Sequence, residues 1–372
     1  MLKNILFTSL LGMPFLVVVT SSSAAAQRQI CEEGRWYRST PMLHNHYVPA
    51  VAAYPDPNGG PDIPVVMGGS EGPPVSFSDF TERFIGGSWT AFTPLIAPTR
   101  TNAGSWATLS DGISYVYSVG GRIPPNDTQK WVQRINTVSG EIALVADMNH
   151  RRAGPKVERI TDATGNVYFV SMGGEDGDVV RFAELYDSRN DCWRDLAAMV
   201  PRRSGDGAVA YRFPQRDPCA VPVREIYYIG GASLPDGSDP TDTFQILTLN
   251  DPSDPSDIGS WTQGPNLPTP ARSISAATIG NKVYVVGGWN PKAAYTGDGE
   301  ALRLVQVYNP DSAIWSYSQE LPEAVYGHRV LAVNNVDAYG NPAPELHVFG
   351  GRNNMDDFTN NHFVLPFHCT TF

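Results

Sequence analysis

The chain has 372 residues, with 38 acidic and 27 basic side chains and a formal net charge of −11. This acidity argues against nucleic acid as a partner, because phosphate binding is driven by Lys and Arg releasing counterions. The 35 Gly and 31 Pro residues break the sequence into short β-rich runs with no long helical periodicity, so we expect an all-β protein.

The first 26 residues have the pattern of a secretory signal peptide. Lys3 gives a positive start, residues 5–19 an apolar core, and residues 24–26 a small-residue cleavage site. A membrane anchor is the alternative, but a span needs about 20 apolar residues and Pro14 interrupts this run. We therefore expect a secreted protein, periplasmic if bacterial, with no membrane span. Residues 27–372 are expected to form a single domain.

A doubled glycine closes a short apolar run six times along the chain. The intervals between the first glycines of successive pairs are 52, 53, 57, 57 and 63 residues. A period near 50 residues indicates a repeated structural unit. The pairs are Gly68-Gly69, Gly120-Gly121, Gly173-Gly174, Gly230-Gly231, Gly287-Gly288 and Gly350-Gly351.

Each glycine pair lies inside a recurring phrase of four strands, named a, b, c and d, which is clearest at residues 272–321. The glycine pair ends strand b, and a tryptophan opens strand d in five of the six repeats. The second repeat has Ile142 at that position. Glycine allows close backbone approach and tryptophan supplies a large apolar plate, so both residue types are expected to pack neighbouring sheets together. The tryptophans are Trp36, Trp89, Trp193, Trp261 and Trp315.

This phrase resembles the kelch repeat. The resemblance rests on the six glycine pairs, the five tryptophans, and a tyrosine before the c-to-d turn at Tyr186-Asp187 and Tyr308-Asn309, and it covers about residues 36–368. It implies a six-bladed kelch β-propeller, in which four-stranded sheets are arranged around a central channel.

The two ends of the chain predict how the ring closes. Only one strand, at residues 363–367, follows the last glycine pair, so the last blade lacks its d strand. The N-terminal residues 35–38 carry the missing tryptophan and are expected to complete that blade. Cys31 and Cys369 then lie at the same end of the blade and should form a disulfide. A second disulfide is expected between Cys192 and Cys219, although four cysteines allow three pairings.

The candidate ligand site lies at one end of the ring, where the b-to-c loops and the d-to-a turns meet. Arginines recur there, and guanidinium groups bind carboxylate, sulfate or phosphate with paired hydrogen bonds. An extracellular protein or an acidic glycan is the expected partner of a non-catalytic binding or scaffold module. The alternative is that these arginines only bind neighbouring carbonyls and acidic side chains within the repeat. The candidates are Arg100, Arg122, Arg152, Arg203, Arg272, Arg352, Asn353, Glu175, Trp289 and Tyr326.

One loop strengthens this expectation by resemblance. Residues 350–354, with Arg352 and its asparagine neighbours, are similar to a b-to-c loop of a kelch adaptor protein in which an arginine and an asparagine contact an acidic peptide.

Two enzyme classes that use kelch propellers are the alternatives. Copper radical oxidases of the galactose oxidase type need a cross-linked Tyr-Cys pair and a Tyr-His pair. This chain has no Tyr-His dipeptide, and His44 and His46 alone do not define a metal site. Periplasmic sialic acid epimerases resemble the chain in repeat number and length, and Glu175 with Arg203 or Arg122 could act on a sugar acid. We expect no cofactor and no metal.

A modification site is also indicated. Asn126-Asp127-Thr128 is an acceptor sequence for N-glycosylation in a b-to-c loop, provided that the source is eukaryotic.

Overall fold

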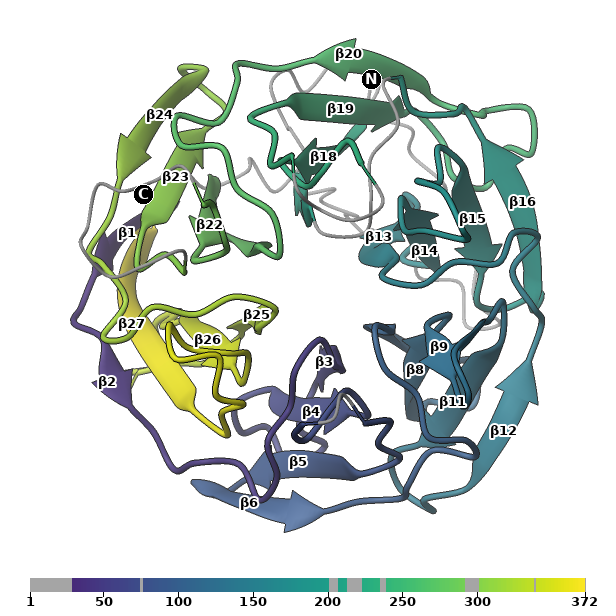
Figure 1. The fold of residues 1–372 in the computed structure, drawn as a ribbon, viewed down its shortest axis with the longest axis horizontal. Coiled ribbons are helices and arrows are strands. Elements are labelled where there is room, and N and C mark those ends of the chain that lie inside the picture. Colours follow the sequence, from purple (N-terminus) through teal and green to yellow (C-terminus); the bar gives the residue numbers. More distant parts are fainter. Residues whose placement is uncertain are drawn as a thin grey trace, which may run out of the picture.

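The protein forms a closed ring of six antiparallel sheets around a central axis (Figure 1). The computed structural model describes residues 29–73, 76–200, 207–212, 223–234, 239–291, 301–337 and 339–371. Within these residues the regular elements are strands, with no helix. The predicted all-β, six-bladed propeller is therefore confirmed.

The first five blades each contain four strands that follow one another in the chain, from the central axis outwards. The blades are β3 (Ala50–Tyr54), β4 (Ile63–Met67), β5 (Thr81–Ile85) and β6 (Ser88–Ala91); β7 (Ala103–Thr108), β8 (Ser114–Val119), β11 (Val132–Asn136) and β12 (Ile142–Val145); β13 (Lys156–Thr161), β14 (Val167–Met172), β15 (Ala183–Asp187) and β16 (Cys192–Leu196); β17 (Ala208–Arg212), β18 (Arg224–Ile229), β19 (Phe244–Leu249) and β20 (Ser260–Gln263); and β21 (Ser275–Ile279), β22 (Lys282–Val286), β23 (Val305–Asn309) and β24 (Ile314–Tyr317). The second blade adds a short hairpin in its b-to-c loop, β9 (Arg122–Ile123) and β10 (Asp127–Thr128).

The last blade joins the two ends of the chain, as predicted. Strands β25 (Arg329–Val333), β26 (Glu345–Phe349) and β27 (His362–Thr371) are completed on the outside by the N-terminal β1 (Gln29–Glu33) and β2 (Tyr37–Arg38), which both pair with β27 (Figure 1). The closing segment is longer than residues 35–38, because β1 extends the pairing. Cys31 lies directly opposite Cys369 in this ladder, and the two form the predicted disulfide.

The glycine pairs attach each blade to the next. The N–H of Gly121 donates to Arg152 O (2.9 Å), and that of Gly288 to Val325 O (2.8 Å), in each case on the loop that enters the following blade. Gly120 and Gly121 both have positive φ, and a Cβ added at Gly120 would lie 2.8 Å from Arg152 O. A larger residue would therefore be strained and would separate the blades. This contact explains why the glycine pair recurs.

The tryptophans make the complementary contact with the preceding blade. The indole Nε1 of Trp193 donates to Ala146 O (2.9 Å), that of Trp261 to Ala197 O (2.7 Å), and that of Trp315 to Pro265 O (2.8 Å). Trp36 repeats the contact across the closure, with Gln319 O as acceptor at 3.1 Å. The predicted role of tryptophan between blades is confirmed.

The hydrophobic core lies between blades rather than inside any one of them. One cluster, for example, joins Ile160 and Val170 of the third blade to Ile226 and Leu247 of the fourth. Each blade therefore depends on its neighbours for burial, as stacked repeats do.

Three of the predictions fall wholly or partly outside the described residues. The predicted signal peptide, residues 1–26, lies outside them, as do Arg203 and Cys219. Cys192 is an exposed free cysteine in the structure. The structure therefore does not support the predicted Cys192–Cys219 disulfide, although Cys219 itself lies outside the described residues.

Candidate functional site

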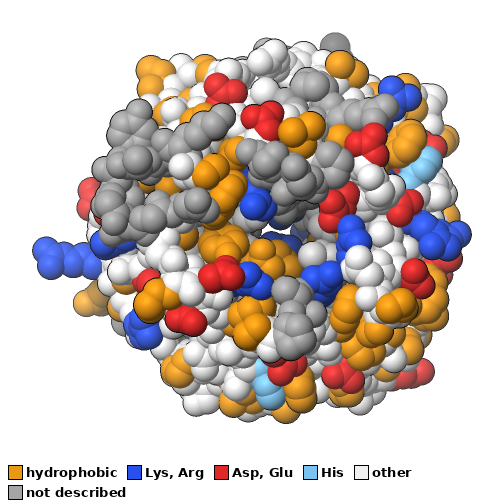
Figure 2. Space-filling model, in the orientation of Figure 1, with side chains coloured by type: hydrophobic (Ala, Val, Ile, Leu, Met, Phe, Trp, Pro, Cys, Tyr) orange, Lys and Arg blue, Asp and Glu red, His pale blue; other side chains and the backbone are white. Residues whose placement is uncertain are grey.

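The d-to-a turns and b-to-c loops meet at one end of the ring through short bridges. Arg100 pairs with Arg122, Arg272 with Trp289, and Tyr326 with Arg352. We call Arg100, Arg122, Arg272 and Arg352 the arginine rim. Figure 2 shows Lys and Arg side chains gathered around the hollow centre of the ring, with Asp and Glu side chains between them.

Arg100 and Arg122 form the most basic part of the rim. Arg122 Nη2 pairs with Glu175 Oε1 of the next blade at 2.8 Å. Arg100 donates to the side-chain oxygen of Asn126 (2.8 Å), and its guanidinium carbon lies 4.9 Å from the centre of the Phe77 ring. Burial, and secondly the nearby charge of Arg122, lower the pKa of Arg100. Two guanidinium groups therefore lie near a single carboxylate.

Arg352 is fixed both by an ion pair and by two aromatic rings. Its Nη1 contacts both carboxylate oxygens of Asp356 at 2.9 Å, and its guanidinium lies over the rings of Phe358 (4.1 Å) and Tyr47 (4.5 Å). The hydroxyl of Tyr326 donates to the same Asp356 carboxylate. Burial and this hydrogen bond raise the pKa of Tyr326. Arg352 and Tyr326 thus share one acidic partner within their own blade.

Three other candidates have structural contacts at the same end of the ring. The Arg272 guanidinium lies 4.2 Å from the centre of the Trp289 ring, which fixes both side chains at the rim. Asn353 accepts hydrogen bonds from the backbone N–H groups of Met355 and Asp357 at 2.9 and 3.0 Å. Asn353 therefore shapes the loop that carries Arg352.

Arg152 is not part of the rim, contrary to our expectation. Its side chain is fully buried and forms an ion pair with Glu184, which is also fully buried. Its Nη1 donates to Gly173 O (3.2 Å) and Phe182 O (2.8 Å). Ala153, one residue later, pairs with Glu175 and holds the position that Arg100 holds in the second blade. Because neighbouring side chains in extended backbone point to opposite sides, a shift of one residue turns this arginine inward.

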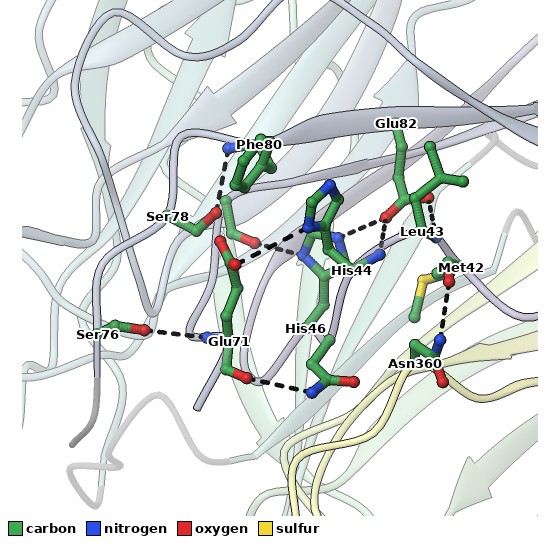
Figure 3. Close-up of polar contacts among 12 residues, drawn as sticks. Met42, Leu43, His44, His46, Glu71, Ser76, Ser78, Phe80, Glu82 and Asn360 are labelled. Atoms are coloured by element: carbon green, nitrogen blue, oxygen red, sulfur yellow. Dashed lines mark hydrogen bonds and ion pairs between the residues drawn. The ribbon is translucent and has the colours of Figure 1, made fainter. Parts of the chain in front are cut away.

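The first blade repeats this arrangement with a histidine (Figure 3). His46 is buried, and its Nε2 lies 2.9 Å from Glu82 Oε1 while its Nδ1 lies 2.7 Å from Gly68 O. Since a carbonyl oxygen can only accept, Nδ1 carries a proton. Glu82 also accepts the backbone N–H groups of Leu43 (2.7 Å) and His44 (3.1 Å).

Sequence reasoning missed the acidic members of these buried pairs. Glu82 and Glu184 occupy the same register position on strand c, two residues after an aromatic side chain that stacks on a histidine of the entering loop. A phenylalanine two residues before a glutamate at the start of strand c, as in Phe80-Thr81-Glu82 and Phe182-Ala183-Glu184, was the available signal.

Comparisons with known proteins agree with this architecture. The Kelch motif family matches residues 270–322. Kelch-like protein 35 of Mus musculus is 26% identical over 82% of this chain and 44% of its own length. Kelch-like protein 31 of Danio rerio is 34% identical over 26% of this chain and 14% of its own length. The chain is a kelch-repeat β-propeller. It spans less than half the length of these two curated relatives.

A solved structure, that of YjhT, is similar to this kelch propeller in fold. The TM-score is 0.62 with 14% sequence identity, and the match covers 87% of this chain and 95% of that chain. At this identity the similarity supports the fold alone.

The four rim arginines line neither of two cavities in the described part of the kelch propeller. A cavity of about 340 Å³ occupies the central channel, and none of the four rim arginines or Glu175 lines it. A second cavity of about 440 Å³ is lined by His150, Asp176 and residues 178–182 of the third blade, among others, and again by none of the rim arginines. The rim is separate from both cavities, and its four arginines are half-buried.

The described residues contain neither a metal cluster nor a membrane-spanning helix. No group of three or more His, Cys, Asp or Glu residues suited to a metal lies among them. His44 stacks on Phe80 with ring centres 3.9 Å apart, whereas His46 is buried against Glu82, so the two histidines have different surroundings. Within the same residues no helix is long and apolar enough to cross a membrane.

Proposed function

We propose that this kelch propeller is a secreted, non-catalytic binding module that takes an acidic segment of a protein partner at its arginine rim, with Arg100 and Arg122 as the main contacts. A rim with arginine beside aromatic rings has the composition that recurs at the energetic centres of protein interfaces.

The observation that carries this proposal is the imbalance of charge at Arg100 and Arg122. Arg122 has Glu175 as its ion-pair partner, whereas no carboxylate of the described residues forms an ion pair with Arg100. The nearby Arg122 charge disfavours the cationic form of Arg100. A carboxylate supplied by a partner would relieve that repulsion and could bind both guanidinium groups with charge-assisted hydrogen bonds.

The aromatic side chains give the same surface apolar anchors. Trp289 and Tyr326 are half-buried beside rim arginines, and Met355 is 78% exposed in the loop between Arg352 and Asp356. A partner would bury these groups while its acidic residues contact the arginines. This combination favours a peptide or protein surface.

The predicted glycosylation site fits the same geometry. Asn126 is exposed, and its side-chain oxygen accepts the hydrogen bond from Arg100. An N-linked glycan attaches to the nitrogen of the side chain, so this hydrogen bond could persist. Such a glycan would lie beside the proposed contact and would limit the size of the partner there.

The test measures binding of a hexaglutamate peptide. Hexaglutamine is the uncharged control peptide, and hyaluronate represents an acidic glycan. The Arg100→Gln/Arg122→Gln double variant should lose about tenfold or more in affinity, equivalent to about 1.4 kcal/mol, and wild-type affinity should fall with added salt. Arg189→Gln is the matched control, because Arg189 is exposed at the opposite end of the third blade.

Preference for hexaglutamate that the double variant loses and Arg189→Gln keeps would support the proposal. Equal binding of both peptides, or unchanged affinity in the double variant, would refute it. Binding of hyaluronate alone would replace the protein partner with an acidic glycan.

A further inference from the structure

The central channel contains a second candidate site, separate from the rim. The innermost strands of all six blades enclose a cavity of about 340 Å³, within the range of small-molecule sites. Much of its wall is built from small side chains, which leave the space open. Among them are Ala52, Ala103, Gly104, Ala208, Ala277 and Ala332.

Charged side chains from opposite sides of the ring line the same cavity. Lys156 and Arg329 begin the innermost strands β13 and β25 of the third and sixth blades, and both are largely buried. Arg329 Nη1 donates to His328 O (3.1 Å) and its Nη2 to Asn102 O of the second blade (3.4 Å). Arg329 therefore reaches across the first blade near the end of the channel that carries the glycine pairs.

Arg159 provides the most direct anchor for an anion. Its guanidinium carbon lies 4.0 Å from the centre of the Trp106 ring, and its Nε donates to Trp106 O at 3.1 Å. Within the part of the chain that the structure describes, its two Nη groups donate to no other atom, and Arg159 forms no ion pair. The guanidinium is thus fixed in orientation while the pair of donors that binds a carboxylate stays available.

Glu158 and Tyr211 lie beside this anchor. Glu158 accepts only the backbone N–H of Arg159 (3.3 Å) among the described residues and forms no ion pair with them. Burial raises the pKa of Tyr211 to about 12, and the charges of Arg224, Glu158 and Arg159 also act on its hydroxyl. The hydroxyl therefore lies near Glu158 and Arg159. Three cationic side chains and two carboxyl groups line the cavity in all, the second carboxyl being Asp62, whose carboxylate accepts from Asn334 at 2.7 Å.

We propose that the central channel binds a small hydroxylated carboxylate, with Arg159 holding the carboxylate group and Glu158 and Tyr211 contacting its hydroxyls. The channel site contains none of the four rim arginines. The cavity is too small for a protein segment of any length, and its charge favours an anion over a neutral molecule.

Binding of an anion in this cavity should be linked to protonation of Glu158. Burial raises the pKa of Glu158 to about 7, although the N–H and charge of Arg159 act in the opposite direction. A bound anion favours the neutral carboxyl, so affinity should be highest below pH 7 and fall by up to about tenfold per pH unit above it. The other titratable or charged side chains of the described residues that line the cavity are Asp62, Lys156, Arg159, Tyr211 and Arg329.

The test is calorimetric titration of the full chain with D-glucuronate between pH 6 and 8. D-glucose is the uncharged control ligand. Glucuronate should bind and glucose should not. Arg159→Gln should weaken binding about tenfold or more, and Glu158→Gln should bind glucuronate with an affinity that no longer changes with pH. Arg189→Gln is the control distant from the channel.

Failure to bind glucuronate at about 10 mM, equal binding of glucose, or unchanged affinity in Arg159→Gln would overturn the proposal. Should Arg159→Gln not fold, Tyr211→Phe and Glu158→Gln provide independent tests of the same site. Hexaglutamate binding at the rim is measured separately, so failure at one site does not decide the other.

Discussion

The first and third blades hold their entering loops with a buried glutamate that contacts a basic side chain, whereas the second blade uses neutral groups. At one register position of strand c, the first blade has Glu82, which contacts His46 of the loop, and the third has Glu184, which contacts Arg152. The second blade has Gln133 there, which accepts the N–H of Ile96 at 2.7 Å. All three side chains therefore satisfy loop N–H groups.

The residue facing this position changes together with it. Gly69, Gly121 and Gly351 donate to the carbonyls of Thr99, Arg152 and His46, which identifies these three as equivalent positions in their loops. Glutamate faces Arg152 or His46, and Gln133 faces Thr99. The inward arginine is therefore one half of a charge pair, which explains why it does not reach the rim.

The largest expected effect comes from Glu184→Gln in the third blade. This change leaves the guanidinium of Arg152 buried without a counter-charge, and a broken buried pair typically costs about 3–5 kcal/mol of unfolding free energy. The guanidinium of Arg152 does not lose its proton in a protein, so its buried charge would remain. The measurement is equilibrium denaturation in urea.

The Arg152→Thr/Glu184→Gln double variant recreates the neutral combination of the second blade. It should recover most of the stability lost in Glu184→Gln, because no unpaired charge remains. A double variant that is less stable than Glu184→Gln would show that the two blades do not use interchangeable arrangements.

The sixth blade extends the comparison to an apolar pair, Val325 and Phe363, at the equivalent positions. Two buried histidines flank it. Burial lowers the pKa of His328 to about 3, assisted by Arg329 and Lys156, and burial with His347 lowers that of His362 to about 3.

Acid should therefore destabilise the sixth blade. Unfolded histidine has a pKa near 6.5, so between pH 6.5 and 3 the unfolded state binds protons that the folded state does not. Stability is complete above pH 6.5 and falls as the pH decreases, by about 2 kcal/mol per histidine at pH 5. Denaturation of the wild type and of His328→Gln at pH 7.5 and pH 5 tests this. An equal loss of unfolding free energy in both proteins between pH 7.5 and pH 5 would show that His328 does not cause the acid sensitivity.

The sequence alone predicts the ring and its closure because these depend on local backbone requirements. Gly120 and Gly121 need positive φ and a close neighbour, so their spacing reports the repeat directly. Cys31 and Cys369 were paired correctly because the missing d strand left only one place for the N-terminus.

The site was predicted less well because it depends on register within loops of unequal structure. Arg152 resembles Arg100 in sequence but lies one residue earlier, which moves its side chain from the rim to the interior. Glu158 and Arg159 were not among the predicted site residues, since their importance comes from a central channel formed by six blades that are distant in sequence. A repeat pattern predicts the scaffold, whereas its exceptions must be located in space.

The smallest expected effect, and the sharpest contrast with the third blade, is Glu82→Gln in the first blade. The imidazole of His46 can be neutral, which the guanidinium of Arg152 cannot. With its Nδ1 proton donated to Gly68 O, the Nε2 of neutral His46 can accept a hydrogen bond from the new amide, whose oxygen still accepts the N–H of Leu43. No buried charge is left unpaired, so the loss should be about 1 kcal/mol, close to that of one hydrogen bond. Urea denaturation beside Glu184→Gln provides the comparison, and equal losses in the two variants would mean that His46 stays charged in the folded protein.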